Sequence, residues 1–206
     1  MKKTYILGNG GYAQEVFEQI FLRNVISNFG GFIILKDDKA FLIGEEGVAP
    51  FTYPKESAFV LGIGNKAWRN IFLTHFFKYY DKTITYWPNA IANNAHISLS
   101  CQMGIGNVFN CFSMTNANAS IGNFNQFNVY SATHHDSSIG NNNIISPHSG
   151  IYGFSSIGNN NFLGANVCIT PKVSIGNDNT ISAGECVFDN MNDREFFQSG
   201  IIRKKP

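Results

Sequence analysis

The sequence predicts an α/β domain followed by an all-β domain that is wound as a parallel β-helix. Three observations lead to this prediction. Large apolar residues recur at every sixth position from Ile91 to Val187, and glycine recurs at every eighteenth position within the same stretch. Before this stretch, short apolar segments alternate with a glycine-rich turn and with segments of helical spacing. The first two patterns are typical of stacked coils, and the third is typical of an α/β sheet.

The six-residue pattern is a ladder in which fifteen of seventeen positions are large and apolar. A period of six fits neither an α-helix nor a simple alternating strand. It fits a chain wound into a three-sided prism, in which each hexad is a short strand plus a corner and the ladder residue points inward. The ladder consists of Ile91, Ile97, Met103, Phe109, Thr115, Ile121, Phe127, Thr133, Ile139, Ile145, Ile151, Ile157, Leu163, Ile169, Ile175, Ile181 and Val187.

Glycine directly follows every third ladder residue, so three hexads make one coil. A corner needs a tight turn or a positive φ, which glycine adopts without strain. By itself this repeat is compatible with a purely structural scaffold, because stacked coils stabilise one another without an active site. These glycines are Gly104, Gly122, Gly140, Gly158 and Gly176.

The chain begins with a strand, a glycine-rich turn and a helix. Tyr5–Leu7 is the predicted strand, Gly8–Tyr12 the turn, and Ala13–Ile20 has helical spacing. This arrangement lets backbone N–H groups approach a phosphate closely, and we expect that contact at Gly10 and Gly11. The full GxGxxG spacing is absent, so a tight turn without a ligand remains an equal alternative.

Two further predicted strands, Phe32–Leu35 and Phe59–Ile63, each end in polar residues. Asp38 follows the first strand and Asn65 follows the second. Because the carboxyl ends of parallel strands meet at one sheet edge, we expect both residues near Gly10, around a nucleotide-type ligand. Taken alone, the segment at Asp38 is better explained as a solvated turn.

The boundary between the two domains is predicted near Trp87. A helix is expected to begin at Trp68–Leu73, and Ile84–Trp87 has the composition of a last strand, which Pro88 breaks. The ladder begins three residues later. We therefore predict an N-terminal domain at 1–87 and a β-helix at 88–206.

Composition argues against several classes of protein. Charged residues make up 14% of the 206-residue chain and the net charge is +1, so a nucleic-acid-binding surface is not indicated. No run of eighteen apolar residues and no signal peptide is evident, so we expect a cytoplasmic protein without membrane insertion. The four cysteines form no CxxC pair and have no zinc-like histidine spacing, so free thiols and no metal site are expected.

The segment His134–His135–Asp136 follows Thr133, one of the two polar interruptions of the ladder. Residues after an inward-pointing position lie on the outer wall of the prism, so core packing does not explain these histidines. An imidazole beside a carboxylate suits general-base chemistry near neutral pH. The alternatives are an ordinary surface histidine and a metal site, but adjacent residues project differently and no third ligand is evident.

Four motifs occur together, in order, before and within the repeat: Gly8–Tyr12, Asp37–Lys39, Gly64–Arg69 and His134–Gly140. In this combination the chain resembles the hexapeptide-repeat sugar acyltransferases, a family that includes sialic acid O-acetyltransferases and N-acetyltransferases of nucleotide-linked 4-amino-4,6-dideoxy sugars. The resemblance covers essentially the whole chain. It implies an N-terminal Rossmann-like domain that holds a nucleotide sugar, followed by a left-handed parallel β-helix.

The resemblance also implies a homotrimer with acetyl-CoA bound in the groove between neighbouring β-helices. His135 matches the catalytic base and Asp136 the acidic residue paired with it, while Gly153 matches a glycine whose N–H faces the thioester oxygen. No metal is implied. The residues that match substrate-binding positions are Gly10, Gly11, Tyr12, Asp38, Lys39, Asn65, Arg69 and Asn128, and those that match acetyl-CoA positions are Gly153, Ala165 and Ala183.

The activity implied is N-acetylation of the C4 amine of a UDP- or dTDP-linked 4-amino-4,6-dideoxy sugar, for bacterial O-antigen, capsule or glycoprotein synthesis. O-acetylation of sialic acid or a related sugar is the alternative within enzymes, because the same His–Asp pair could serve an alcohol. A non-catalytic alternative is a trimeric scaffold with a nucleotide-sensing domain, and a failure to bind acetyl-CoA would favour it.

Overall fold

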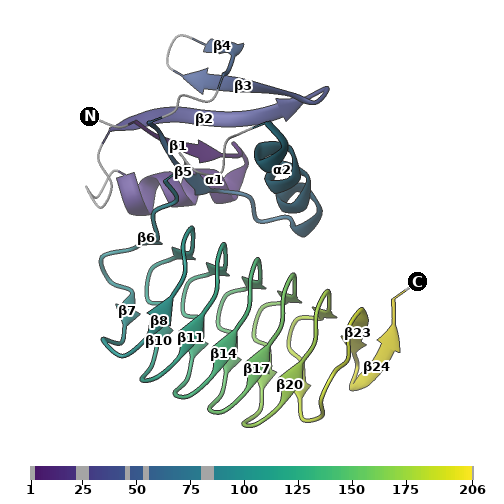
Figure 1. Cartoon of the computed structure of the whole chain (residues 1–206). Helices are drawn as coiled ribbons and strands as arrows, with labels where there is room; N and C mark the ends of the chain where they lie inside the picture. The colour runs from purple at the N-terminus through teal and green to yellow at the C-terminus, as the bar shows by residue number, and fades with distance from the viewer. Residues whose placement is uncertain (1–2, 22–27, 45–46, 53–55, 80–85, 206) are drawn as a thin grey trace. The chain divides into compact units, whose positions relative to one another are not determined.

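The computed structural model describes residues 3–21, 28–44, 47–52, 56–79 and 86–205, and it divides into two compact units, Met1–Asn93 and Asn94–Pro206 (Figure 1). The first unit is an α/β unit and the second is a β-helical unit.

The α/β unit contains a five-stranded sheet in the order β4-β3-β2-β1-β5. At its centre, β1 (Thr4–Leu7) runs parallel to both β2 (Phe29–Lys36) and β5 (Ala58–Leu61). These are the three strands predicted from the apolar segments. The antiparallel strands β3 (Lys39–Gly44) and β4 (Gly47–Pro50), which extend the sheet beyond β2, were not predicted.

Two helical segments follow the parallel strands. α1 (Gly11–Val16) begins the predicted first helix, but the chain then widens into the π-helical turn η1 (Phe17–Phe21). With this widening, Phe17 and Phe21 both contact Phe29 of β2, at 4.5 and 5.0 Å between ring centroids. The second helix, α2 (Lys66–Tyr79), begins two residues before the predicted start.

The expected last strand at Ile84–Trp87 falls partly outside the described residues. Tyr86 forms an isolated parallel bridge with Ala58, and the Trp87 ring packs against Phe76 at 4.8 Å. Trp87 is 4% exposed and therefore belongs to the core of this unit. The short strand β6 (Ala90–Ile91) follows.

The β-helical unit is built from two-residue strands that stack in parallel as three sheets (Figure 1). Each ladder residue pairs with the residue eighteen positions away, as Thr115 does with Thr133, so the predicted coil length is confirmed. The first sheet contains β7 (His96–Ile97), β10 (Met114–Thr115), β13 (Ala132–Thr133), β16 (Gly150–Ile151), β19 (Cys168–Ile169) and β22 (Cys186–Val187). The second contains β8 (Gln102–Met103), β11 (Ser120–Ile121), β14 (Ser138–Ile139), β17 (Ser156–Ile157) and β20 (Ser174–Ile175), and the third contains β9 (Val108–Phe109), β12 (Gln126–Phe127), β15 (Ile144–Ile145), β18 (Phe162–Leu163) and β21 (Thr180–Ile181).

The inward-pointing ladder forms the core of this unit. From Phe109 to Val187 every ladder residue is buried, including the polar Thr115 and Thr133. The rings of Phe109 and Phe127, one coil apart, stack face to face with their centroids 4.4 Å apart. Ile97 and Met103, in the first coil, are only partly buried.

A column of buried asparagines lines one corner of the prism. Asn125 donates from both its backbone N–H and its Nδ2 to Oδ1 of Asn107, at 2.8 and 3.1 Å, and Nδ2 also donates to the carbonyl of Gly140 at 2.8 Å. The same pattern recurs one coil later at Asn143. These side chains supply hydrogen bonds to corner backbone groups that strand pairing leaves out.

The C-terminal hairpin ends the stack. β23 (Glu195–Gln198) pairs in parallel with β21, and β24 (Ile201–Lys204) returns antiparallel to it (Figure 1). Across the described residues, no helix reaches the length and apolar character needed to traverse a bilayer.

Candidate active site

The His135–Asp136 pair lies on the outer wall of the β-helix, at the corner that follows β13. The backbone N–H of His134 still bonds to the next coil, at Ile151 O, and the chain then turns. Nδ1 of His135 lies 2.8 Å from Oδ2 of Asp136. The side chains are 55% and 33% exposed, so the pair is open to solvent.

Asp136 is held in its ionised form by two hydrogen-bond donors. The hydrogen bond with His135 is the larger cause of its lowered pKa, and the bond from Asn118 is the second. Asn118 Nδ2 donates to Asp136 Oδ1 at 3.1 Å from the coil before. Asn118 was not among the predicted residues, although eighteen residues separate it from Asp136 and the coil length could have identified it.

Gly153 lies directly beneath the His135 ring, one coil further on. A Cβ at this position would stand 2.8 Å from Cε1 and 3.0 Å from Nε2 of His135. A larger residue would therefore displace the imidazole. In the part of the chain that the structure describes, the Gly153 N–H donates no hydrogen bond. Phe154 stands edge-on to the same imidazole at 5.3 Å.

His134 points to a different partner from its neighbour. Its ring stacks on Tyr152 at 4.4 Å, and burial, followed by repulsion from His135, lowers its pKa. The two histidines therefore do not converge as a pair of metal ligands would. Over the described ranges, no cluster of three His, Cys, Asp or Glu side chains is suited to hold a metal ion.

Three predicted site residues lie on another edge of the prism. Asn128 directly follows β12, and its Oδ1 accepts hydrogen bonds from Asn110 and Gln126 at 3.2 and 3.3 Å. Ala165 and Ala183 follow β18 and β21, which belong to the same sheet as β12. Within one chain, the structure therefore places Asn128, Ala165 and Ala183 along one corner and the His135–Asp136 pair along a different one.

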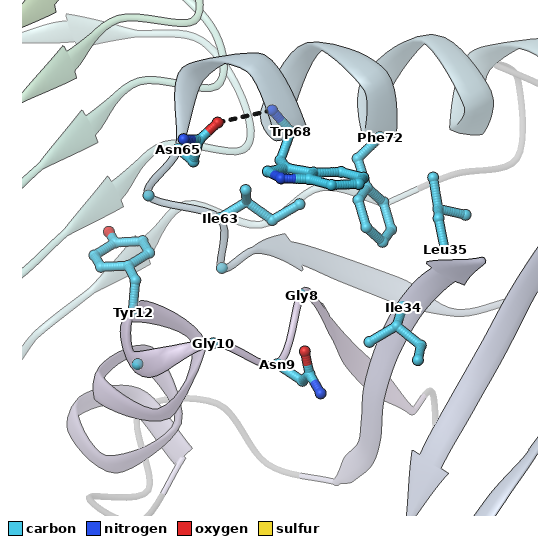
Figure 2. Close-up of a pocket in the computed structure, with 13 residues that line it drawn as sticks. Gly8, Asn9, Gly10, Tyr12, Ile34, Leu35, Ile63, Asn65, Trp68 and Phe72 are labelled. Atoms are coloured by element: carbon cyan, nitrogen blue, oxygen red, sulfur yellow. Dashed lines mark hydrogen bonds between the residues drawn. The ribbon is translucent and has the colours of Figure 1, made fainter. Parts of the chain in front are cut away.

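The α/β unit contains a cavity of about 400 Å³ at the carboxyl ends of β1, β2 and β5 (Figure 2). Of the predicted residues, Gly10, Gly11, Tyr12 and Asn65 line it. The walls are completed by residues that the sequence analysis did not select, among them Trp68 and Phe72 of α2. The full lining is Gly8, Asn9, Gly10, Gly11, Tyr12, Ile34, Leu35, Gly62, Ile63, Gly64, Asn65, Trp68 and Phe72.

The glycines of the turn differ in what the fold requires of them. Gly8 has φ of 105°, and a Cβ there would lie 2.8 Å from the carbonyl oxygen of Gly62, so the fold itself demands glycine. Gly10 has φ of −73°, and no atom of the described residues lies within 4 Å of a Cβ built on it or on Gly11. At Gly10 and Gly11 the fold leaves open space beside the cavity.

Asp38 and Lys39 are not among the lining residues. The chain reverses immediately after β2, with Asp37 and Asp38 as the two turn residues at φ of 49° and 53°. Oδ1 of Asp38 lies 3.7 Å from His75 Nε2, and Oδ2 lies 3.7 Å from Lys78 Nζ. The predicted convergence therefore holds for Gly10 and Asn65 and fails for Asp38, because the hairpin directs Asp38 toward the later turns of α2.

Arg69 supports the cavity from behind and does not line it. Its side chain is 1% exposed, and Nη1 donates to the carbonyl oxygen of Ile63 at 3.0 Å. Burial lowers the pKa of Arg69 to about 10, an effect that the neighbouring Tyr12 opposes. Beside it, Asn65 Oδ1 accepts a hydrogen bond from the Trp68 N–H at 3.1 Å and caps the start of α2.

No protein-family model matches the chain, and no curated protein matches it in sequence. Solved structures do match its fold. The acetyltransferase domain of PglB from Neisseria gonorrhoeae FA1090, in complex with acetyl coenzyme A, is 18% identical over 99% of both chains, with a TM-score of 0.79. PerB from Caulobacter crescentus, in complex with CoA and GDP-perosamine, is 23% identical over 98% of both chains, with a TM-score of 0.80. WeeI from Acinetobacter baumannii AYE is 17% identical over 98% of this chain and 99% of its own, also at 0.80. The chain shares the fold of these proteins over almost its whole length.

Proposed function

We propose that this protein is an acetyl-CoA-dependent sugar N-acetyltransferase. Its acceptor is the C4 amine of a nucleotide-linked 4-amino-4,6-dideoxy sugar, and its product serves the assembly of a bacterial surface glycan. The α/β unit is a Rossmann-like nucleotide-sugar domain and the second unit is a left-handed β-helix. Two fold relatives support the co-substrate and acceptor class, since one was solved with acetyl coenzyme A and the other with CoA and GDP-perosamine.

The observation that carries the proposal is the His135–Asp136 pair above Gly153. Since Nδ1 faces the Asp136 carboxylate at 2.8 Å, the neutral form of the ring carries its proton on Nδ1 and a lone pair on Nε2. The side chain is 55% exposed, and Nε2 lies next to Gly153. This is the protonation pattern that a general base requires.

In the proposed reaction, His135 Nε2 removes a proton from the acceptor amine as its nitrogen attacks the thioester carbonyl. The N–C bond forms, the C–S bond breaks, and the departing thiolate takes up a proton to give CoA. Asp136 stabilises the imidazolium formed during the transfer. The Gly153 N–H is the candidate donor to the developing oxyanion.

We further propose that the active enzyme is a homotrimer whose sites lie between copies. Asn128, Ala165 and Ala183 are the remaining predicted acetyl-acceptor and CoA positions, and they lie along a different corner from His135. A site that combines both corners needs a second copy, and closed cyclic symmetry lets every copy contribute both.

Mixing two inactive variants tests this arrangement. His135→Ala and Asn128→Ala chains each lose activity alone, but a co-refolded equal mixture regains sites in which both groups are intact. Random trimers would recover roughly a quarter of wild-type activity, if each site joins one corner from each of two copies. A mixture with no activity above the two variants would contradict a shared site.

The function itself is tested by release of CoA thiol from acetyl-CoA, with purified protein and a set of acceptors. We expect turnover with a UDP-, dTDP- or GDP-linked 4-amino-4,6-dideoxy sugar and none with the matching 4-hydroxy sugar nucleotide. Preferential turnover of sialic acid would replace the proposal with O-acetylation. An absence of acetyl-CoA binding in calorimetry would replace it with a scaffold.

A further inference from the structure

The cavity of the α/β unit has two ends of different chemistry (Figure 2). One end carries the glycine turn at Gly10, together with Tyr12 and Asn65. At the other end the lining is apolar, from the end of β2 and the first half of α2. This apolar end consists of Ile34, Leu35, Trp68 and Phe72.

Trp68 is the feature of this cavity that core packing does not explain. It is 55% exposed, whereas Phe72 and Phe76, which follow it on α2, are 4% and 0% exposed. Figure 2 shows the indole extending from α2 across the cavity toward Leu35. A large flat apolar side chain left half in solvent beside a cavity offers its surface to a ligand.

The start of α2 is held in place by two hydrogen bonds, which fix the backbone that carries the indole. The backbone N–H of Trp68 donates a hydrogen bond to Asn65 Oδ1 at 3.1 Å. The next residue, Arg69, is buried and bonded to Ile63 O at 3.0 Å. These contacts fix the first turn of α2, from which the Trp68 side chain reaches the cavity while the Arg69 side chain is buried.

We propose that Trp68 is the stacking surface for the base of a nucleoside diphosphate whose phosphates lie at the Gly10–Gly11 turn. This inference rests on the proposed function and adds to it a residue that contacts the base and a direction for the substrate. Among the described residues, no charged side chain lines the cavity, so the phosphates depend on backbone N–H groups, and open space at the two glycines permits their approach. An aromatic face at the apolar end suits any base, because every base has a π-face.

Intrinsic fluorescence tests the contact directly, because the chain has two tryptophans and the other, Trp87, is buried at 4% exposure. In a Trp87→Phe variant, Trp68 is the only indole. Titration with GDP, UDP and dTDP should change its emission saturably, whereas inorganic pyrophosphate, which has no base, should not. If this variant does not fold, the difference between wild-type and Trp68→Phe emission gives the same signal. Nucleotide binding seen by calorimetry without an emission change from Trp68 would overturn the proposal.

Affinity provides the second test. Loss of one base-stacking ring should raise the Kd for nucleoside diphosphates about 10- to 100-fold in Trp68→Ala, while Trp68→Phe stays within severalfold of wild type. The control is Ile71→Ala, since Ile71 is 50% exposed on the same helix and does not line the cavity. A Trp68→Ala protein with wild-type affinity, or one that loses pyrophosphate binding to the same extent, would overturn the stacking role.

Acetyl transfer, measured in parallel, separates this inference from the proposed function. A chain whose Trp68 responds to nucleotides but which transfers no acetyl group would retain the stacking role and lose the proposed function. A chain that acetylates a nucleotide sugar with unchanged KM in Trp68→Ala would retain the function and lose the stacking role.

Discussion

In the β-helical unit, buried asparagine side chains bond to residues 15 or 18 positions away, whereas in the α/β unit buried His75 lies beside Asp38, 37 positions earlier. Among the described residues, the Asn143 side chain hydrogen-bonds to Asn125, Asn161 and Gly158, all in adjacent coils. Arg69 instead supports the loop at Ile63 that forms one wall of the cavity.

This difference has a mechanical consequence. In a stack of coils each repeat contacts only its neighbours, so a substitution in one coil should disturb only the adjacent coils. In the α/β unit the aromatic core joins distant segments, since Phe59 contacts Phe76 and Trp87 at 5.0 and 5.8 Å. We therefore expect substitutions in the column to separate stability from activity, and substitutions of buried side chains in the α/β unit to couple them. Four predictions test this expectation.

The largest expected effect is on turnover in His135→Ala. Removal of a general base should lower kcat by roughly two to four orders of magnitude, because the half-exposed ring contributes chemistry and little packing. Thermal unfolding should remain within a degree or two of wild type. The control is His96→Ala, an exposed histidine of the first coil, which should keep wild-type turnover. Near-wild-type turnover in His135→Ala would refute the assignment of the base.

Arg69→Met should both destabilise the protein and weaken nucleotide binding. The substitution leaves the Ile63 carbonyl without its donor, at a cost of about 2–4 kcal/mol in the free energy of unfolding, and it releases a wall of the cavity. Urea unfolding and calorimetric titration with GDP, UDP or dTDP measure the two effects.

The counterpart of Arg69→Met in the column is Asn143→Ala, which should cost about 1–3 kcal/mol yet leave nucleotide affinity unchanged. The comparison between units fails if Arg69→Met binds nucleotide normally, or if Asn143→Ala loses nucleotide affinity.

Gly10→Ala should weaken nucleoside diphosphate binding about tenfold without lowering stability. The fold has room for a methyl group at this position. The methyl group should therefore hinder only a ligand that approaches the backbone closely. Gly8→Ala is the contrast, because its φ of 105° and the contact with Gly62 O make it destabilising. Unchanged affinity in Gly10→Ala would place the phosphates elsewhere.

The smallest expected effect is a gain in stability from Thr115→Val. The Thr115 hydroxyl is buried in the prism, and among the described residues it has no hydrogen-bond partner. Replacement by a methyl group of the same shape should raise the free energy of unfolding by about 1 kcal/mol. Urea unfolding provides the measurement, and a loss of stability would show that the hydroxyl is bonded after all.

The sequence was sufficient to predict the β-helix and much of its candidate site. The position of Gly153 beneath His135 follows from the eighteen-residue coil, and the same spacing would have identified Asn118 as a partner of Asp136. In this unit, residues eighteen positions apart in the sequence lie side by side in adjacent coils. A sequence motif therefore predicts which side chains meet.

The α/β unit could be predicted only in outline. Its parallel strands are continuous apolar segments, and these were recognised. Asp38 was misplaced because the chain turns at Asp37–Asp38 into a hairpin whose strands have weak alternation. The partners of Asp38 on α2, His75 and Lys78, and the burial of Arg69 depend on packing between segments far apart in the chain. No local pattern encodes such contacts.

The register of the asparagine column also constrains how such a chain can change in length. Each side chain of the column reaches a group in the coil above or below, so an insertion of one or two residues would shift all later asparagines out of alignment. A duplication or deletion of eighteen residues would restore every one of these bonds. We therefore expect the interior of the column to grow or shorten by whole coils, whereas at its C-terminal end a step of sixteen residues still brings the Glu195 N–H to Asn179 Oδ1 at 2.6 Å.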